Sequence, residues 1–112
     1  MKPRNYPLTL RKGQSLDITM AWRGKNGNLV DLAGCLVRMD LLASLDDTFP
    51  LAQFSDLGGG SLNIDEDDLI HLTMDTGLTD APFWDSVGAY RMSVIQTNGE
   101  IVDLLEGSVI RL

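Results

Sequence analysis

Cysteine and histidine are almost absent from this sequence. Its 112 residues include one cysteine, Cys35, and one histidine, His71. A single cysteine excludes an internal disulfide framework and any zinc site built from several cysteines, which suits a protein made in a reducing compartment. Cys35 stands at the head of an apolar segment, so we expect it to pack as a small hydrophobic residue rather than to act as a reactive thiol.

Basic residues are also scarce. Nine lysines and arginines stand against 16 aspartates and glutamates, which gives a net charge of -7 at pH 7. So acidic a chain is unsuited to binding the nucleic-acid backbone as its main activity. Residues 1–25 are the exception, because they contain six basic side chains and one acidic one, a net charge of +5. Two explanations are open: this segment lies beside acidic strands of its own chain, or it reaches an acidic neighbour.

No long hydrophobic run is present. Arg38, Asp40 and Asp46 interrupt the most apolar windows, and residues 1–14 lack the apolar core of a secretory signal. We therefore expect neither a transmembrane span nor a signal peptide. Hydrophobic residues still make up 44% of the chain, enough for a core without metals or disulfides. We predict one domain over residues 1–112.

Apolar and polar residues alternate in several short segments, which is the period of half-buried β-strands. The clearest segments are residues 16–22, 35–42, 69–74 and 88–95. Turn-forming residues separate them, and almost no helical period is present. The pattern predicts an all-β fold, an antiparallel β-sandwich of about seven strands with little helix. Residues 43–60 hold no sustained period and are expected to form a long loop.

The C-terminal region predicts a β-hairpin. Asn98-Gly99 separates two alternating segments, which is the strongest short-range hairpin signal. A two-residue turn there would place four pairs of residues opposite one another: Thr97 with Glu100, Ile95 with Val102, Met92 with Leu105, and Arg91 with Glu106. The last pair is opposite in charge, which supports this register.

Residues 88–92, Gly-Ala-Tyr-Arg-Met, resemble the start of strand F of an immunoglobulin domain. In that strand a tyrosine two residues before a core position caps the corner between strands E and F. Met92 stands where an antibody domain has cysteine. The resemblance implies an immunoglobulin-like topology without membership of the antibody family.

Candidate chemical sites are few. His71 is expected on the solvent-facing side of its strand, and no other residue is spaced to complete a catalytic triad with it. The acidic residues 65–68 could bind a hard cation, but they lack the ligand spacing, glycine and terminal glutamate of an EF-hand. We therefore expect a solvated acidic turn. Gly58-Gly59-Gly60 opens a strand rather than a helix, unlike a phosphate-binding loop. We expect no enzymatic activity, metal or cofactor.

Side chains that could meet a partner fall into a basic group and an aromatic group. Residues 1–12 are basic and contain two prolines, and they are expected to form an extended arm that docks on an adjacent subunit. Aromatic side chains could form a ligand groove or a surface that stacks on sugars and partners: Trp22, Phe49, Phe54, Phe83 and Trp84. The open alternative is the core for Trp22 and closure of one end of the sandwich for Phe83 and Trp84. The expected interface residues are Lys2, Arg4, Tyr6, Arg11, Lys12, Phe49, Phe54 and Trp84.

Two longer stretches resemble small virion proteins of tailed bacteriophages. Residues 26–39, Asn-Gly-Asn-Leu-Val-Asp-Leu-Ala-Gly-Cys-Leu-Val-Arg-Met, are similar to that family's turn, its hydrophobic-Asp-Leu-Thr-Gly segment and its strand with arginine. Residues 89–109 look like its Tyr-x-hydrophobic strand, glycine hairpin and closing Leu-x-Gly-x-Val strand. The family includes the N-terminal domain of baseplate upper proteins, whose fold is an immunoglobulin-like or related β-sandwich.

The resemblance implies a non-enzymatic structural or adaptor protein of the phage tail, baseplate, neck or fibre-attachment region. Such a protein would be made in the host cytoplasm and located in the virion. It would bind other virion proteins and copies of itself, as a symmetric homo-oligomer, through sheet edges, termini and loops, with no role for nucleic acid or membrane. Two alternatives are open. The first is a carbohydrate- or receptor-binding module at a fibre, using Phe49, Phe54, Trp84 and the loop 43–60. The second is a small hydrolase or metal-dependent enzyme using His71 or Asp67.

Overall fold

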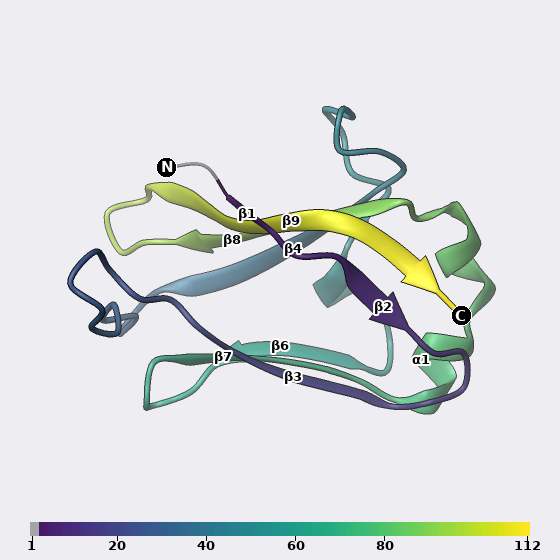
Figure 1. Ribbon diagram of the computed structural model, residues 1–112, viewed down its shortest axis with the longest axis horizontal. Helices are drawn as coiled ribbons and strands as arrows, with labels where there is room; N and C mark the ends of the chain where they lie inside the picture. Colours follow the sequence, from purple (N-terminus) through teal and green to yellow (C-terminus); the bar gives the residue numbers. More distant parts are fainter. Residues whose placement is uncertain (1–2) are drawn as a thin grey trace.

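The computed structural model describes residues 3–112, which form two β-sheets packed face to face (Figure 1). The larger sheet contains β1 (Arg4–Asn5), β2 (Leu8–Leu10), β4 (Leu36–Leu42), β5 (Ala52–Gln53), β8 (Ala89–Ile95) and β9 (Ile101–Arg111). The smaller sheet contains β3 (Leu16–Ala21), β6 (Gly60–Ile64) and β7 (Leu69–Met74). The predicted β-sandwich is confirmed. The strand number is higher than expected, because two-residue strands such as β1 and β5 are too short to show a period.

The order of the strands determines which of them lie at sheet edges. The larger sheet runs β1-β9-β8-β4-β5, with β2 also paired to β9, and the smaller sheet runs β3-β7-β6. All pairs are antiparallel except those of β1 and β2, which run parallel to β9. The sandwich is therefore mixed rather than purely antiparallel, and β1 and β3 are both edge strands.

Three short helical segments lie in the connections: η1 (Phe54–Asp56), α1 (Thr76–Asp80) and η2 (Pro82–Ser86). The carboxylate of Asp75 caps α1 by accepting a hydrogen bond from the N–H of Leu78, at 2.8 Å. The indole N–H of Trp84 donates to the carbonyl of Leu78, also at 2.8 Å. These contacts hold α1 and η2 together at one end of the sandwich (Figure 1).

The core lies between the two sheets and follows the predicted alternation. In β7 the side chains of Ile70, Leu72 and Met74 are buried, whereas the intervening side chains are partly exposed. Met92 and Val94 of β8 face them from the larger sheet and are also buried. Burial of these apolar faces is the main favourable contribution to folding.

The hairpin between β8 and β9 matches the prediction over part of its length. Arg91 pairs with Glu106 and Met92 with Leu105, as expected, but Ile95 pairs with Ile101 rather than with Val102. The turn is one residue longer than predicted, because the N–H of Gln96 bonds to the carbonyl of Glu100 and Gly99 adopts a positive φ of 89°. A bulge in β9 opposite Met92/Ser93 offsets the extra residue and restores the register beyond it.

The N-terminal segment is part of the sandwich rather than a free arm. Residues 4, 5 and 8–10 pair with β9, and Leu8 and Leu10 are buried in the core. The expectation of a docking arm over residues 1–12 is therefore wrong for this segment, because its apolar side chains and backbone groups are already used within the chain. Lys2 lies outside the described residues.

Tyr90 holds the same segment in place. Its hydroxyl donates a 2.6 Å hydrogen bond to the carbonyl of Tyr6, between β1 and β2. The sequence predicted that Tyr90 would cap a corner between neighbouring strands. In the structure it instead bonds to the N-terminal segment where the chain passes from β1 to β2 (the N-terminal crossing). Gly107 of β9 permits the close approach, because a Cβ there would lie 2.5 Å from the carbonyl oxygen of Tyr6.

Residues 43–60 are less irregular than predicted. After a loop, β5 pairs with β4, and η1 inserts Phe54 into the core with 1% of its surface exposed. A Cβ on Gly60 would collide with the Phe54 ring, so the glycine allows that ring to pack against β6. Only the part of this region before β5 projects from the sandwich, as Figure 1 shows.

Candidate functional site

One side of the sandwich is open between the two sheets. The edge strands β1 and β3 face each other there, and each has one strand neighbour among residues 3–112. A groove of about 560 Å³ runs between them. Its lining residues are Arg4, Tyr6, Ile18, Thr19, Met20, Ala21, Trp22, Arg23, Ile70, Met92, Leu104 and Leu105.

Apolar side chains that face inward are incompletely covered in this groove. Ile18 and Met20 of β3, with Trp22 beyond it, point toward the core but remain partly exposed. The inward side chains of the adjacent strand β7 are buried. The difference arises because β3 is at the sheet edge, where no strand of the described residues covers its outer side. An apolar groove beside unpaired strand edges is typical of a surface that binds another chain.

Positive charge lies on the rim of the groove. Arg4 and Arg23 line it from opposite edges and are both exposed. The guanidinium of Arg23 donates to the carbonyl of Gly27, at 3.1 Å, which keeps its side chain near the end of β3. The groove therefore favours an apolar occupant that also carries carboxylates.

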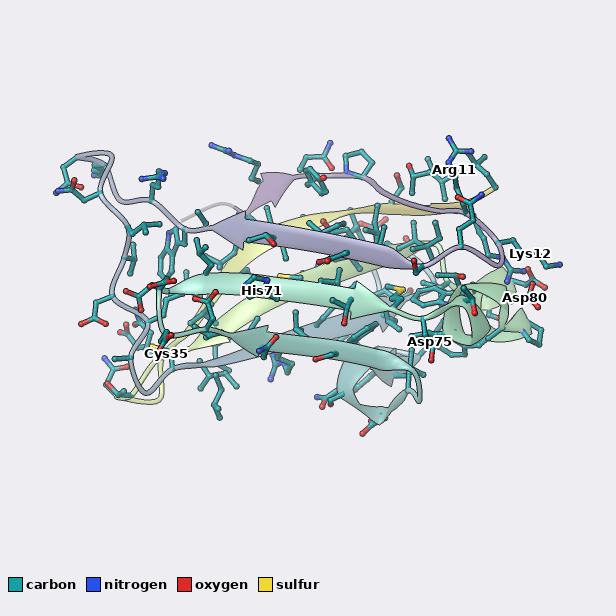
Figure 2. All side chains as sticks on the ribbon, turned by 90° about the horizontal axis from the view of Figure 1, so that it is seen from below. Arg11, Lys12, Cys35, His71, Asp75 and Asp80 are labelled. Carbon is teal, nitrogen blue, oxygen red and sulfur yellow. The ribbon has the colours of Figure 1, made fainter. Side chains whose placement is uncertain are left out.

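The expected interface residues do not form one surface. Arg4 and Tyr6 line the groove, but Arg11 and Lys12 lie in the connection between β2 and β3, at the end of the sandwich near α1 (Figure 2). Over residues 3–112 the ion pairs involve Arg38, His71 and Arg111. The N-terminal basic residues are therefore not neutralised by direct ion pairs in this part of the chain.

Outside the N-terminal segment, two of the three aromatic residues expected at an interface are in the core. Phe54 and Trp84 are 1% and 3% exposed, whereas Phe49 is 84% exposed. Phe54 packs against Gly60, and Trp84 closes one end of the sandwich through its hydrogen bond to Leu78. Neither ring presents a face to a partner. Of these three aromatic residues, Phe49 is therefore the one whose ring is available at an interface.

Trp22 was an aromatic candidate for a ligand groove in the sequence and does line this one, whereas Ile18 and Met20 of β3 were not identified as functional. The alternation over residues 16–22 correctly predicted that Ile18, Met20 and Trp22 share the inward face. It carried no signal that this strand is at a sheet edge, because edge position depends on which distant strands pair with it. Cys35 is half-buried and packs against the core, close to the expectation.

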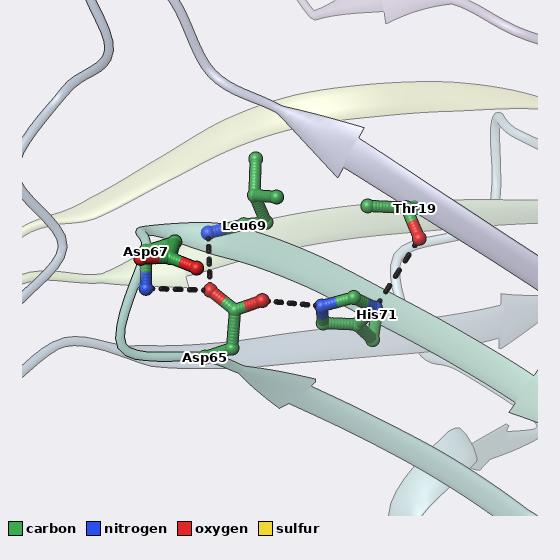
Figure 3. Close-up of polar contacts among 5 residues, drawn as sticks. All are labelled: Thr19, Asp65, Asp67, Leu69 and His71. Carbon is green, nitrogen blue, oxygen red and sulfur yellow. Dashed lines mark hydrogen bonds and ion pairs between the residues drawn. The ribbon is translucent and has the colours of Figure 1, made fainter.

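A polar array that the sequence did not predict lies on the outer face of the smaller sheet (Figure 3). His71 is on that face as expected, but its Nε2 lies 2.5 Å from Oδ2 of Asp65 and its Nδ1 lies 3.2 Å from the hydroxyl oxygen of Thr19. The hydrogen bond with His71, with further bonds from the N–H groups of Leu69 and Asp67, holds the pKa of Asp65 below its usual value.

The array has the order of a carboxylate, an imidazole and a hydroxyl, which the sequence reasoning had excluded. Its connections are those of a structural clasp. Thr19 and His71 are directly opposite each other on β3 and β7, and Asp65 Oδ1 accepts from two backbone N–H groups of the β6–β7 turn. The array therefore joins β3, β7 and this turn through side chains on an exposed sheet face.

Two carboxylates of the acidic turn accept hydrogen bonds within the chain. Asp65 accepts the hydrogen bonds just described, and Asp68, which has a φ of 63°, accepts from the N–H of Leu32 at 3.0 Å. Over the described residues no group of three or more histidine, cysteine, aspartate or glutamate side chains is placed to hold a metal ion. Within residues 3–112 no helix is both long enough and apolar enough to cross a membrane.

Comparison with known proteins is informative at the level of the fold. No family model and no curated protein matches the sequence. Solved structures do match: the titin M3 domain has a TM-score of 0.55 at 14% identity, over 98% of this chain and 91% of that one. The fold is immunoglobulin-like.

A second match comes from a complex. The crystal structure of Dpr1 IG1 bound to DIP-eta IG1 matches with a TM-score of 0.56 at 13% identity, over 99% of this chain and 91% of that one. A third, a titin A168–169 fragment, has a TM-score of 0.53 at 9% identity and is covered over 45% of its length. At these identities the immunoglobulin-like topology is shared, and function has to be argued from the surface of this chain.

Proposed function

We propose that this protein is a non-enzymatic assembly module, a structural or adaptor protein of a tailed-phage virion. The observation that carries the proposal is the open side of the sandwich, where an apolar groove lies between two unpaired sheet edges. Monomeric domains normally protect such edges, because exposed strands pair with other chains. The feature is therefore suited to joining this chain to a neighbour.

Assignment to a virion is supported by the sequence resemblance over residues 26–39 and 89–109. The tail, baseplate, neck and fibre-attachment regions are all repeated assemblies, and a small sandwich with an exposed edge suits their symmetric packing. The Dpr1 structure is titled as one immunoglobulin domain bound to another. It is a precedent for a domain of this fold binding another domain of the same fold.

The alternative of a sugar- or receptor-binding module has less support. It required the faces of Phe49, Phe54 and Trp84, and the last two are buried. Loss of glycan binding in a Trp84→Ala variant would not be diagnostic, because truncating a buried tryptophan costs about 3–5 kcal/mol of stability. We therefore retain assembly as the proposed function.

The test is coexpression of the full chain with the proteins encoded beside its gene, followed by density-gradient sedimentation. The proposal expects the chain to sediment with a particle or subassembly in a fixed copy number, measured by quantitative mass spectrometry. A chain that remains at the top of the gradient with every combination of neighbours would overturn the proposal.

A further inference from the structure

The loop that follows β4 presents the most exposed large apolar side chain of the described residues. Phe49 is 84% exposed, and Leu51, two residues later, is 47% exposed. The acidic residues Asp46 and Asp47 precede them and are also exposed. The chain turns at Asp46, where the N–H of Asp47 bonds to the carbonyl of Ser44, and bends again at Phe49. Residues 46–51 (the acidic-aromatic segment) therefore form an irregular loop with carboxylates at its start, and Pro50 disfavours helical backbone at Phe49.

The groove has the complementary chemistry. Its floor contains Ile18, Met20 and Trp22, which are incompletely covered apolar side chains. Arg4 and Arg23 provide positive charge at its rim. An occupant with apolar side chains beside carboxylates would complete both features, and within residues 3–112 the acidic-aromatic segment has this combination in exposed form.

We propose that the groove of one molecule receives the acidic-aromatic segment of a second copy. Phe49 enters the space between β1 and β3, Leu51 covers the apolar edge, and Asp46 or Asp47 lies near Arg4 or Arg23. The inference rests on the proposed function in treating the chain as an assembly module, and it names a partner, another copy of the chain.

The two surfaces cannot satisfy each other within one molecule. Figure 1 shows the loop after β4 projecting from the top of the molecule, whereas β3 lies at the bottom. A contact between two different surfaces is heterologous, so each added copy leaves one groove and one segment free. Repetition of the contact produces an open chain, or a ring if the rotation closes.

The experiment uses two variants that each lose one surface. Phe49→Asp removes the apolar side chain of the segment and leaves the groove intact. Met20→Glu places a carboxylate on the apolar floor of the groove, where it opposes the acidic segment, and leaves the segment itself intact. Size-exclusion chromatography with light scattering, over a concentration series, should show oligomers for the unmodified chain and monomers for each variant. An equimolar mixture of the two variants should form a heterodimer and no larger species, because it contains one competent groove and one competent segment.

Controls separate this contact from general surface effects. Leu36→Asp also replaces an exposed apolar residue, 66% exposed, but on β4 outside the groove, and should associate like the unmodified chain. Asp46→Lys combined with Asp47→Lys should weaken association. Unchanged association would show that the carboxylates do not pair with Arg4 or Arg23 in the contact. An unmodified chain that is monomeric throughout the series, an oligomeric Phe49→Asp variant, or a mixture without heterodimer would overturn the proposal. A monomeric chain that still sediments with virion proteins would leave the proposed function standing.

Discussion

The hydroxyl of Tyr90 and the carbonyl of Tyr6 are joined by a 2.6 Å hydrogen bond between residues 84 positions apart in the sequence. Tyr90 is a buried residue of β8, and Tyr6 lies between the two short strands that pair with β9. This bond, the pairing with β9 and the close approach at Gly107 together fix the N-terminal crossing. The crossing in turn forms one wall of the groove, through Arg4 and Tyr6.

Tyr90→Phe should lower the free energy of unfolding by about 1 kcal/mol, because it removes one buried hydrogen bond and leaves the ring in place. Urea denaturation measures the change. Tyr6→Phe is the matched control, since the bond uses the backbone carbonyl of Tyr6 and not its hydroxyl; its stability should stay within about 0.5 kcal/mol of the unmodified chain. Equal losses in both variants would contradict the assigned bond.

Tyr90 also predicts a loss of stability at high pH. Burial, with Tyr6 nearby, raises the pKa of Tyr90 from 10.0 to about 12. Between these values the unfolded chain has released the phenolic proton while the folded chain retains it. The unfolded state binds fewer protons, so stability falls as the pH rises from about 10 towards 12 and is unaffected by this group below that window. Urea midpoints measured from pH 9 to 12 should decline less steeply in Tyr90→Phe, and parallel declines would contradict the prediction.

Gly107→Ala should destabilise the fold by about 1–3 kcal/mol through overpacking. Its Cβ would lie 2.5 Å from the carbonyl oxygen of Tyr6 and 3.0 Å from the nitrogen of Pro7, so the crossing would have to shift. Gly58→Ala is the control, because no atom lies within 4 Å of the added Cβ and Gly58 has no positive φ. Thermal and urea unfolding of both variants measure the difference, and a Gly107→Ala protein as stable as the control would show that the approach is looser than described.

The sequence predicted those parts of the fold that depend on local alternation. The inward faces of β7 and β8, the hairpin after β8 and the outward position of His71 all follow from period-two patterns and turn residues. The parallel pairing of β1 and β2 with β9 could not be predicted in this way, because it joins the two ends of the chain and uses strands of two and three residues.

The candidate site was the least predictable feature for the same reason. The groove exists because β1 and β3 each have one strand neighbour among residues 3–112, which is a property of the strand order and not of any segment. The hairpin shows a related limit. The extra residue in the turn at Gly99 and the extra residue of the bulge in β9 shift the register in opposite directions. The predicted partners of Arg91 and Met92 are therefore right although the predicted turn is wrong.

Asp65 predicts a loss of stability in acid if the array with His71 is the structural clasp described above. The pKa of Asp65 is lowered from 3.8, so below that value the unfolded chain takes up a proton before the folded chain does. The stabilisation is therefore present above pH 3.8 and is lost as the pH falls through the lower, folded-state value.

Asp65→Asn keeps an oxygen that can accept from the turn but removes the charge. It should be less stable than the unmodified chain at neutral pH, and the two proteins should converge in acid. Asp67→Asn is the control, because Asp67 contributes its backbone N–H to the turn. Urea midpoints from pH 2 to 7 measure the curves. A constant difference between the unmodified chain and Asp65→Asn at every pH would contradict the assigned role of the charge.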